Sequence, residues 1–306
     1  MKEFQTIAFI GLGNMGLPMA TNLVKAGYTV YGVDTNSEAE KKFSQDGGKI
    51  GVPTELLAKQ VDIVMTSLPT PQIVEKVYLG DGGIVENADS ALTIIDFSTI
   101  SPQLNEKIYA ITKEKGIDYL GAPVSGSVSG AVNGTLTIMV GGDKKVYEQA
   151  LPLLRVLGDN PFHLGESVGV GTVIKLLNNL MIGFYTQAVA EAVALGEQMG
   201  VKADTIYDVL SVSFGQSRIY ERNYKGHIAQ NDFNPGFSTN LLLKDLKLAK
   251  QMADENQTPL PIGDKLIDLY SEAVEKGYGE QDMASVYLMV KELIASKKDG
   301  LVSNKN

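Results

Sequence analysis

The sequence predicts an α/β domain with a doubly wound parallel sheet, followed by a domain made only of helices. Up to about residue 165, short apolar runs alternate with amphipathic segments that end at glycine, a pattern typical of parallel strands covered by helices on both faces. Beyond that point the periodicity is helical, with no convincing strand. The 306 residues suffice for two hydrophobic cores. We therefore expect two domains, residues 1–165 and 166–306.

The individual elements follow from the same patterns. Six apolar runs are expected to be strands, at residues 6–10, 28–34, 62–69, 91–99, 117–123 and 136–142. Segments such as PMATNLVKAG and PQLNEKIYAITKEKG lie between them with helical spacing. In the second domain, helices are expected at about 172–199, 202–213, 238–256 and 260–276.

Composition excludes several classes of function. A net charge of -9 argues against nucleic acid as a partner, because phosphate binding needs a basic face. Cysteine is absent and His163 and His227 are the two histidines, so we expect no disulfide, no metal site and no histidine triad. The N-terminal apolar run is too short for a signal peptide, and no stretch is long enough to span a membrane. A soluble, cytoplasmic protein without a membrane partner is expected.

The segment Gly11-Leu12-Gly13-Asn14-Met15-Gly16 is a G-x-G-x-x-G motif between the first strand and the first helix. In that context the first glycine permits the turn, the second lets a pyrophosphate approach the backbone, and the third lets the helix pack closely on the strand. The helix N-terminus then offers free amides to the anion. The motif predicts a Rossmann-type dinucleotide site, and a purely structural glycine turn is the alternative.

Asp34 strengthens the dinucleotide prediction. It ends the second expected strand, 23 residues after Gly11, where a carboxylate can accept hydrogen bonds from the adenosine ribose. A carboxylate there also repels a 2′-phosphate, and Thr35 follows where an NADP enzyme would offer an arginine nearby. The sequence therefore favours NAD over NADP as the cofactor.

Lys175 stands on an otherwise apolar helix, where an unpaired cation is costly to bury. Asn179 is four residues further and points the same way, with Asn178 beside it, so one ammonium and two amides share a face. Partial burial lowers the pKa of a lysine, as a proton donor and acceptor at neutral pH requires. The alternative is a lysine that reaches water near the helix start.

The stretch APVSGSVSGAVNGTLTIMVGG places a small, polar loop after the fifth expected strand, at the carboxyl end of the sheet. Ligands bind at that edge in open α/β folds. Exposed backbone amides with serine hydroxyls suit a carboxylate, which makes Ser125, Gly126 and Ser127 candidates for substrate binding. An ordinary flexible connection is the alternative.

Taken together, these segments resemble the β-hydroxyacid dehydrogenase family, which includes 3-hydroxyisobutyrate dehydrogenase and tartronate semialdehyde reductase and has 6-phosphogluconate dehydrogenase as a larger relative. The resemblance covers nearly the whole chain. It is carried, in family order, by FIGLGNMGLPMATNLVKAG, DFSTISP, APVSGSVSGAVNGTLTIMVGG, GVGTVIKLLNN and LLLKDLKLA.

The resemblance implies roles for individual residues. Lys175 would be the general acid/base, Asn179 would orient the substrate oxygen, and Ser125 with Gly126 would hold the substrate carboxylate. The resemblance further implies that the cofactor cleft is lined by Leu68, Pro69 and Thr99, with Lys244 near the nicotinamide. From the residues alone, Lys244 with Lys247 and Lys250 would be interpreted as a solvated face.

Two departures from the family pattern bear on the substrate. Family members often read DAPVSGG where this chain has GAPVSGS, so Gly121 replaces an acid and Ser127 replaces a glycine. Arg218 and Arg222 lie in a segment without a family match, where either could meet a second carboxylate of the substrate or form a surface ion pair.

The sequence therefore predicts an NAD-dependent oxidoreductase that interconverts a small 3-hydroxy acid and its semialdehyde. Two alternatives remain. One is an imine reductase, a group that shares the two-domain plan but generally departs from lysine at the position of Lys175. The other is an NAD-binding or interaction protein without catalysis. The helix from about Thr172 is apolar nearly all round between Leu180 and Tyr185, which predicts a homo-oligomer, dimer or tetramer.

Overall fold

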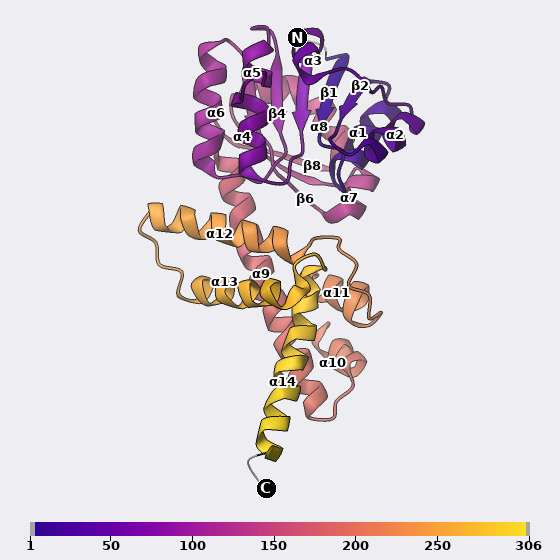
Figure 1. Ribbon diagram of the computed structural model, residues 1–306, viewed down its shortest axis with the longest axis vertical. Helices are drawn as coiled ribbons and strands as arrows, with labels where there is room; N and C mark the ends of the chain where they lie inside the picture. Colours follow the sequence, from indigo (N-terminus) through magenta and orange to yellow (C-terminus); the bar gives the residue numbers. More distant parts are fainter. Residues whose placement is uncertain (1–3, 304–306) are drawn as a thin grey trace. The chain divides into compact units, whose positions relative to one another are not determined.

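The computed structural model describes the backbone of residues 4–303 and the side chains of residues 4–297 (Figure 1). The chain forms two compact units, Met1–Leu176 and Leu177–Asn306. Unit 1 contains two hydrophobic clusters and unit 2 contains a third. The predicted class, a Rossmann-type sheet domain followed by a helical domain, is confirmed.

Unit 1 is built on an eight-stranded sheet with the order β2-β1-β3-β4-β5-β7-β6, in which β8 pairs with β7. The strands are β1 (Thr6–Ile10), β2 (Thr29–Val33), β3 (Ile63–Thr66), β4 (Thr93–Asp96), β5 (Asp118–Gly121), β6 (Val124–Ser125), β7 (Thr137–Gly141) and β8 (Asn160–Gly165). Neighbouring strands pair in parallel along the series β2, β1, β3, β4 and β5, so the carboxyl ends of these five strands meet at one edge.

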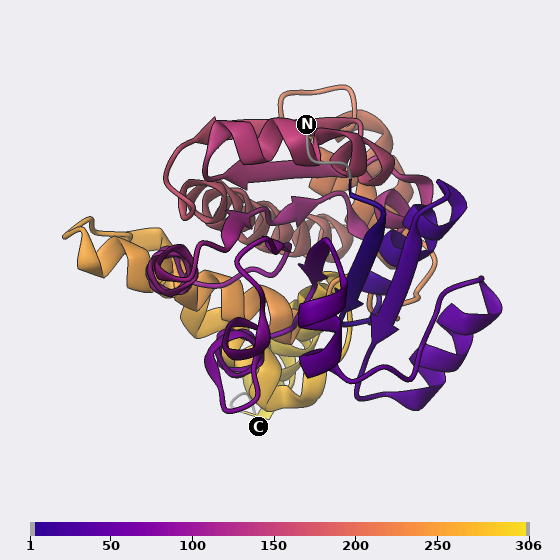
Figure 2. The ribbon, with the colours of Figure 1, turned by 90° about the horizontal axis from the view of Figure 1, so that it is seen from above.

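Helices cover both faces of this sheet (Figures 1 and 2). They are α1 (Gly16–Lys25), α2 (Ser37–Gln45), α3 (Thr54–Gln60), α4 (Pro71–Leu79), α5 (Ile84–Asn87), α6 (Pro102–Glu114), α7 (Ser127–Asn133) and α8 (Lys144–Leu157). Alternate residues of β1 supply the two cores. Ile7 and Phe9 belong to the cluster that includes α1 and α8, whereas Ala8 and Ile10 belong to the cluster that includes α4 and α6.

Three parts of unit 1 differ from the prediction. The strand expected at 136–142 is β7, and it runs antiparallel to its neighbour β5. A parallel return would need a long crossover connection, whereas residues 122–136 carry only the short elements β6 and α7. The expected polar loop therefore contains a strand and a helix. The strand β8 was not predicted, since NPFHLG has neither clean alternation nor a continuous apolar run.

Unit 2 is helical, and no strand occurs among the described residues after Gly165. α9 (Val170–Gln198) begins in unit 1 and continues into unit 2, where α10 (Ala203–Leu210), α11 (Arg218–Asn223), α12 (Thr239–Glu255), α13 (Pro261–Ala273) and α14 (Val286–Ser303) follow. Shorter turns of helix are η1 (Tyr224–Ile228), η2 (Val274–Tyr278) and η3 (Met283–Ser285). The four predicted helices are present as α9, α10, α12 and α13, whereas α11 and α14 were not predicted.

None of the helices between residues 4 and 303 combines the length and the apolar character that a membrane crossing requires.

Candidate active site

The glycine motif forms a tight turn between β1 and α1. Gly11 has a φ of +93°, and a Cβ there would lie 2.3 Å from the Ser67 carbonyl oxygen. Both the backbone conformation and the lack of space therefore exclude a side chain at this position. A Cβ on Gly16 would lie 1.8 Å from the Gly11 carbonyl oxygen, so α1 can pack this closely on the turn only because residue 16 is glycine. By contrast, a Cβ on Gly13 would meet nothing within 4 Å, so this backbone faces open space.

The start of α1 is suited to an anion. Its N-cap position is Met15, which makes no side-chain capping bond, and its first turn contains no acidic residue. The first amides of a helix have no partner within it and carry a partial positive charge. The residues present therefore fit the pyrophosphate of a dinucleotide, with Gly13, Asn14 and Met15 at the approach.

Asp34 follows β2 and is tied to the glycine turn. Its Oδ2 accepts a hydrogen bond of 2.6 Å from the Leu12 amide, and its Oδ1 accepts one of 2.8 Å from the Asn36 amide. A carboxylate has about four acceptor positions, so these two bonds orient the group and leave acceptors for the hydroxyls of a ribose.

The turns after β3 and β4 are joined by hydrogen bonds. The Leu68 amide donates to Ser98 Oγ (2.9 Å), and the Ser98 amide donates to Asp96 Oδ1 (2.9 Å). Pro69 is exposed and Thr99 half-buried in the same two turns. These residues therefore lie at the carboxyl edge of the sheet, the edge at which open α/β folds bind ligands.

The serine-glycine segment begins at the end of β6 and continues into α7. Ser125 is half-buried, and Gly126 and Ser127 are exposed. Ser127 has a φ of +61°, a conformation that glycine adopts more easily, and its hydroxyl lies 2.9 Å from that of Ser129.

α7 packs beside α1, where Asn22 Nδ2 donates to the Ala131 carbonyl at 2.8 Å. A groove beside the glycine turn is lined by Gly13 and Asn14 from the turn and by Val128 and Val132 from α7. The structure thus brings two of the predicted segments together within unit 1.

Lys175 lies in the second turn of α9 and is half-buried. Asn179, one turn further on the same helix, is 0% exposed. Asn178 Nδ2 donates to Asn179 Oδ1 at 3.0 Å, and Asn179 Nδ2 donates to Asp245 Oδ2 at 2.6 Å. The side chain of Asn179 is therefore oriented from both ends.

Asp245 on α12 was not identified from the sequence. It is 2% exposed, and Lys244 Nζ lies 3.0 Å from its Oδ1 as a charged neighbour. The sequence does show an acid within the mainly apolar segment LLLKDL. A carboxylate that is buried there needs a polar partner, and this need could have marked Asp245 as a residue of the site. Lys244 itself is 22% exposed and paired, rather than part of a solvated face.

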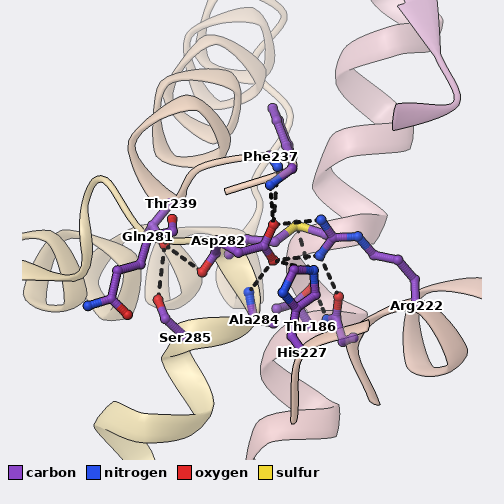
Figure 3. Close-up of polar contacts among 12 residues, drawn as sticks. Thr186, Arg222, His227, Phe237, Thr239, Gln281, Asp282, Ala284 and Ser285 are labelled. Carbon is purple, nitrogen blue, oxygen red and sulfur yellow. Dashed lines mark hydrogen bonds and ion pairs between the residues drawn. The ribbon is translucent and has the colours of Figure 1, made fainter. Parts of the chain in front are cut away.

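The sequence left undecided whether Arg222 binds a substrate carboxylate or forms an ion pair. In the structure it pairs with Asp282 of unit 2 (Figure 3). It forms two hydrogen bonds, of 2.5 and 2.6 Å, with the fully buried carboxylate of Asp282. The same carboxylate accepts from the amides of Gly236, Phe237 and Ala284. Burial alone would raise the pKa of Asp282, but the hydrogen bonds and charge of Arg222 outweigh it and hold that pKa below its ordinary value.

Arg218, by contrast, is exposed at the start of α11. Within the part of the chain that the structure describes, no three His, Asp or Glu side chains gather in a way that suits a metal ion.

Comparison with known proteins assigns both parts of the chain. Residues 6–165 match the NAD-binding domain of 6-phosphogluconate dehydrogenase. Residues 169–290 match the family described as the NAD-binding part of NADP-dependent 3-hydroxyisobutyrate dehydrogenase.

Similar proteins extend over nearly the full length. A 2-(hydroxymethyl)glutarate dehydrogenase from Eubacterium barkeri is 38% identical, over 94% of this chain and 95% of its own. An NAD-dependent L-serine dehydrogenase from Pseudomonas aeruginosa is 37% identical, over 92% and 96%. Among solved structures, Mycobacterium tuberculosis 3-hydroxyisobutyrate dehydrogenase with L-serine is 33% identical, has a TM-score of 0.85, and covers 94% of this chain and 99% of its own. The chain belongs to the β-hydroxyacid dehydrogenase family and is an NAD(P)-dependent enzyme acting on hydroxyl donors.

Proposed function

We propose that this enzyme interconverts a small 3-hydroxy acid and its semialdehyde, with NAD as the preferred cofactor and Lys175 as the general acid/base. The substrate class is that of 3-hydroxyisobutyrate or 2-hydroxy-3-oxopropionate. The observation that carries the proposal is that half-buried Lys175 and buried Asn179 lie one turn apart on α9, and that the amide of Asn179 is held by buried Asp245. A lysine at this position also argues against an imine reductase or a protein without catalysis.

The names of the relatives support a narrower substrate class. 2-(Hydroxymethyl)glutarate, L-serine and 3-hydroxyisobutyrate share the core HOCH₂–CH(R)–COO⁻ and differ in the group R. One carbon, which bears R, then separates the alcohol carbon from the carboxylate in every case. An acid/base at the alcohol and amides at the carboxylate serve all three, so R decides between them.

Each residue has a distinct task in this mechanism. A bound NAD would supply the hydride acceptor for the oxidation, and its reduced form would supply the hydride for the reduction. Lys175 removes the proton of the substrate hydroxyl during oxidation and returns it during reduction. Asn179 Nδ2 carries two hydrogens, of which one is used on Asp245, so the other can orient the substrate oxygen. Ser125, Gly126 and Ser127 bind the substrate carboxylate through a hydroxyl and backbone amides.

The cofactor preference rests on Asp34. Its carboxylate is fixed by the Leu12 and Asn36 amides at the end of β2, where a 2′-phosphate would bring like charges together. The remaining cofactor contacts that we propose come from the glycine turn, Leu68, Pro69, Thr99 and Lys244.

The test is NAD-linked turnover of a panel of acids by the wild type and by Lys175→Ala. The panel contains 3-hydroxyisobutyrate, L-serine, 2-(hydroxymethyl)glutarate, glycerate and 4-hydroxybutyrate, with NADP as the control cofactor. We expect one acid with the HOCH₂–CH(R)–COO⁻ core to be oxidised with NAD preferred, and kcat to fall by about a hundredfold or more in Lys175→Ala.

Lys247→Ala is the matched control, because it removes an exposed lysine of α12. It should keep wild-type turnover. The proposal fails if no acid or semialdehyde reacts while NAD still binds, or if both lysine variants lose activity equally.

A further inference from the structure

A continuous chain of buried hydrogen bonds crosses unit 1 at the carboxyl edge of the sheet. The Tyr78 hydroxyl lies 2.5 Å from Thr66 Oγ1, which donates to Asp96 Oδ1 at 2.8 Å. On the other side, Tyr119 donates to Asn105 Oδ1 at 2.8 Å, and Asn105 Nδ2 donates to Thr172 Oγ1 at 2.8 Å. The six residues, Tyr78, Thr66, Asp96, Tyr119, Asn105 and Thr172, are each no more than 2% exposed.

The direction of these bonds is determined by the backbone. Asn105 Nδ2 also faces the Ser101 carbonyl oxygen at 3.4 Å, and a carbonyl can only accept, so the amide nitrogen must point that way. Asn105 Oδ1 then faces the Tyr119 hydroxyl, which donates to it at 2.8 Å and also donates to Asp96 Oδ2 at 3.5 Å. Burial raises the pKa of Asp96.

The chain joins two parts of the candidate site. In the middle of the chain, Asp96 Oδ1 also accepts from the Ser98 amide, and Ser98 Oγ accepts from the Leu68 amide in the adjoining turn. At the end of the chain, Thr172 lies in the first turn of α9, three residues before Lys175 and on the same side of the helix.

Asn105 occupies space that Gly121 leaves empty. A Cβ on Gly121 would lie 2.8 Å from Asn105 Oδ1 and 2.4 Å from the Val168 carbonyl oxygen, just before α9. The buried polar group beside the start of α9 therefore comes from α6, and the backbone before α9 closes on the bare glycine.

We propose that Asn105 and Thr172 are positioning residues for the dehydrogenase reaction: through their hydrogen bond they fix the first turn of α9 and thereby the place of the Lys175 ammonium. This inference rests on the proposed role of Lys175. A small displacement of a reacting group lowers the rate of the chemical step steeply, whereas the residues that bind substrate and cofactor are unchanged. The hydrogen bond should therefore act on kcat and leave KM nearly constant.

The test compares Thr172→Val, which keeps the shape of the side chain but removes its acceptor, with Thr172→Ser, which keeps the acceptor. We expect Thr172→Val to lower kcat by about tenfold to a hundredfold, with KM changed by less than about twofold. The limb of the kcat/KM pH profile that depends on Lys175 should shift as well. Thr172→Ser should restore most of the rate and the wild-type pH profile.

Thr112→Val is the matched control for lost stability. Thr112 is also 0% exposed, but its hydroxyl donates to the Tyr109 carbonyl within α6, outside the chain of bonds. Both valine variants should lower Tm, and only Thr172→Val should change kcat and the pH profile. A kcat that is unchanged in Thr172→Val, or lowered equally in Thr112→Val, overturns the inference.

Lys175→Ala separates this inference from the proposed function. If that variant loses turnover while Thr172→Val keeps it, the positioning role is wrong and the acid/base role stands. If Lys175→Ala retains turnover, the proposed function itself fails.

Discussion

Asp96 is a carboxyl group that the fold encloses completely, at 1% exposure. Burial raises its pKa, while the hydrogen bonds from Ser98 and Thr66 counteract the shift only in part. The folded protein therefore keeps a proton on Asp96 at pH values where the unfolded chain has released it. Because the folded state binds more protons, the contribution of Asp96 to stability falls as pH rises from its unfolded pKa through its folded one.

The variant Asp96→Asn tests this pH dependence. Asparagine has the shape of the neutral acid and does not titrate, so its contribution to the free energy of unfolding is independent of pH. We expect the wild type to lose stability relative to Asp96→Asn as pH rises from about 4 upward, at up to about 1.4 kcal/mol per pH unit. Urea unfolding followed by circular dichroism at several pH values measures the difference. A constant difference between the two proteins would contradict the argument.

Single residues could be singled out as candidates where chemistry and position coincide in the sequence. Lys175 stood out as a cation on an apolar helix, and Asp34 as an acid at the end of a strand. Arg222 could not be assigned, because its partner Asp282 lies 60 residues away and only the folded unit brings them together. Ser127 shows the same limit: its φ of +61° explains why glycine suits this position, and a sequence does not display φ.

At the scale of secondary structure, α9 and α12 are joined by the hydrogen bond from Asn179 to Asp245. The two residues are 66 positions apart, and both side chains are almost fully buried. Leaving a buried amide without a partner costs about 1–3 kcal/mol. The bond thus contributes to the packing of unit 2 as well as to the orientation of Asn179.

Substitution of Asp245 should affect rate and stability to different degrees. In Asp245→Ala, Asn179 loses its acceptor, so we expect the protein to be destabilised by about 1–3 kcal/mol and kcat to fall by about tenfold or more. Asp245→Asn keeps an acceptor oxygen for Asn179 and should retain more of the rate. Steady-state kinetics and urea unfolding of both variants provide the comparison. Equal loss of rate in the two variants would show that the negative charge matters, rather than the hydrogen bond.

Elements were predicted best where the hydrophobic period was long and unbroken. The strands β1 to β5 and the helices α9, α10, α12 and α13 all lie within their predicted ranges or within two residues of them. The direction of β7 was missed because direction depends on the path of residues 122–136, which local periodicity does not report. The short α11 was not predicted because its six residues are too few to show a helical period, and Gly215, Gln216 and Ser217 precede it.

At the scale of the whole molecule, the two cores of unit 1 and the core of unit 2 account for most of the large apolar side chains. A stripe on α9 within unit 2 is an exception. Leu177, Met181 and Tyr185 follow one another at four-residue spacing, on one side of the helix, and are 45%, 53% and 42% exposed. Contiguous apolar surface of this kind marks an interaction site in soluble proteins. The homo-oligomer that the sequence predicts would cover this stripe with a second copy of the chain.

The variant Met181→Glu tests this assembly. A carboxylate in the middle of an apolar contact would have to lose its water without gaining a partner, so the oligomer should dissociate toward the monomer of 32.9 kDa. Light scattering coupled to size exclusion gives the mass directly. Leu56→Glu introduces the same charge at an apolar residue of unit 1 that is 49% exposed, and it should leave the mass unchanged. A wild-type protein that is monomeric at micromolar concentration would contradict the predicted homo-oligomer. Equal dissociation of both variants would show that the contact between copies does not lie specifically on the α9 stripe.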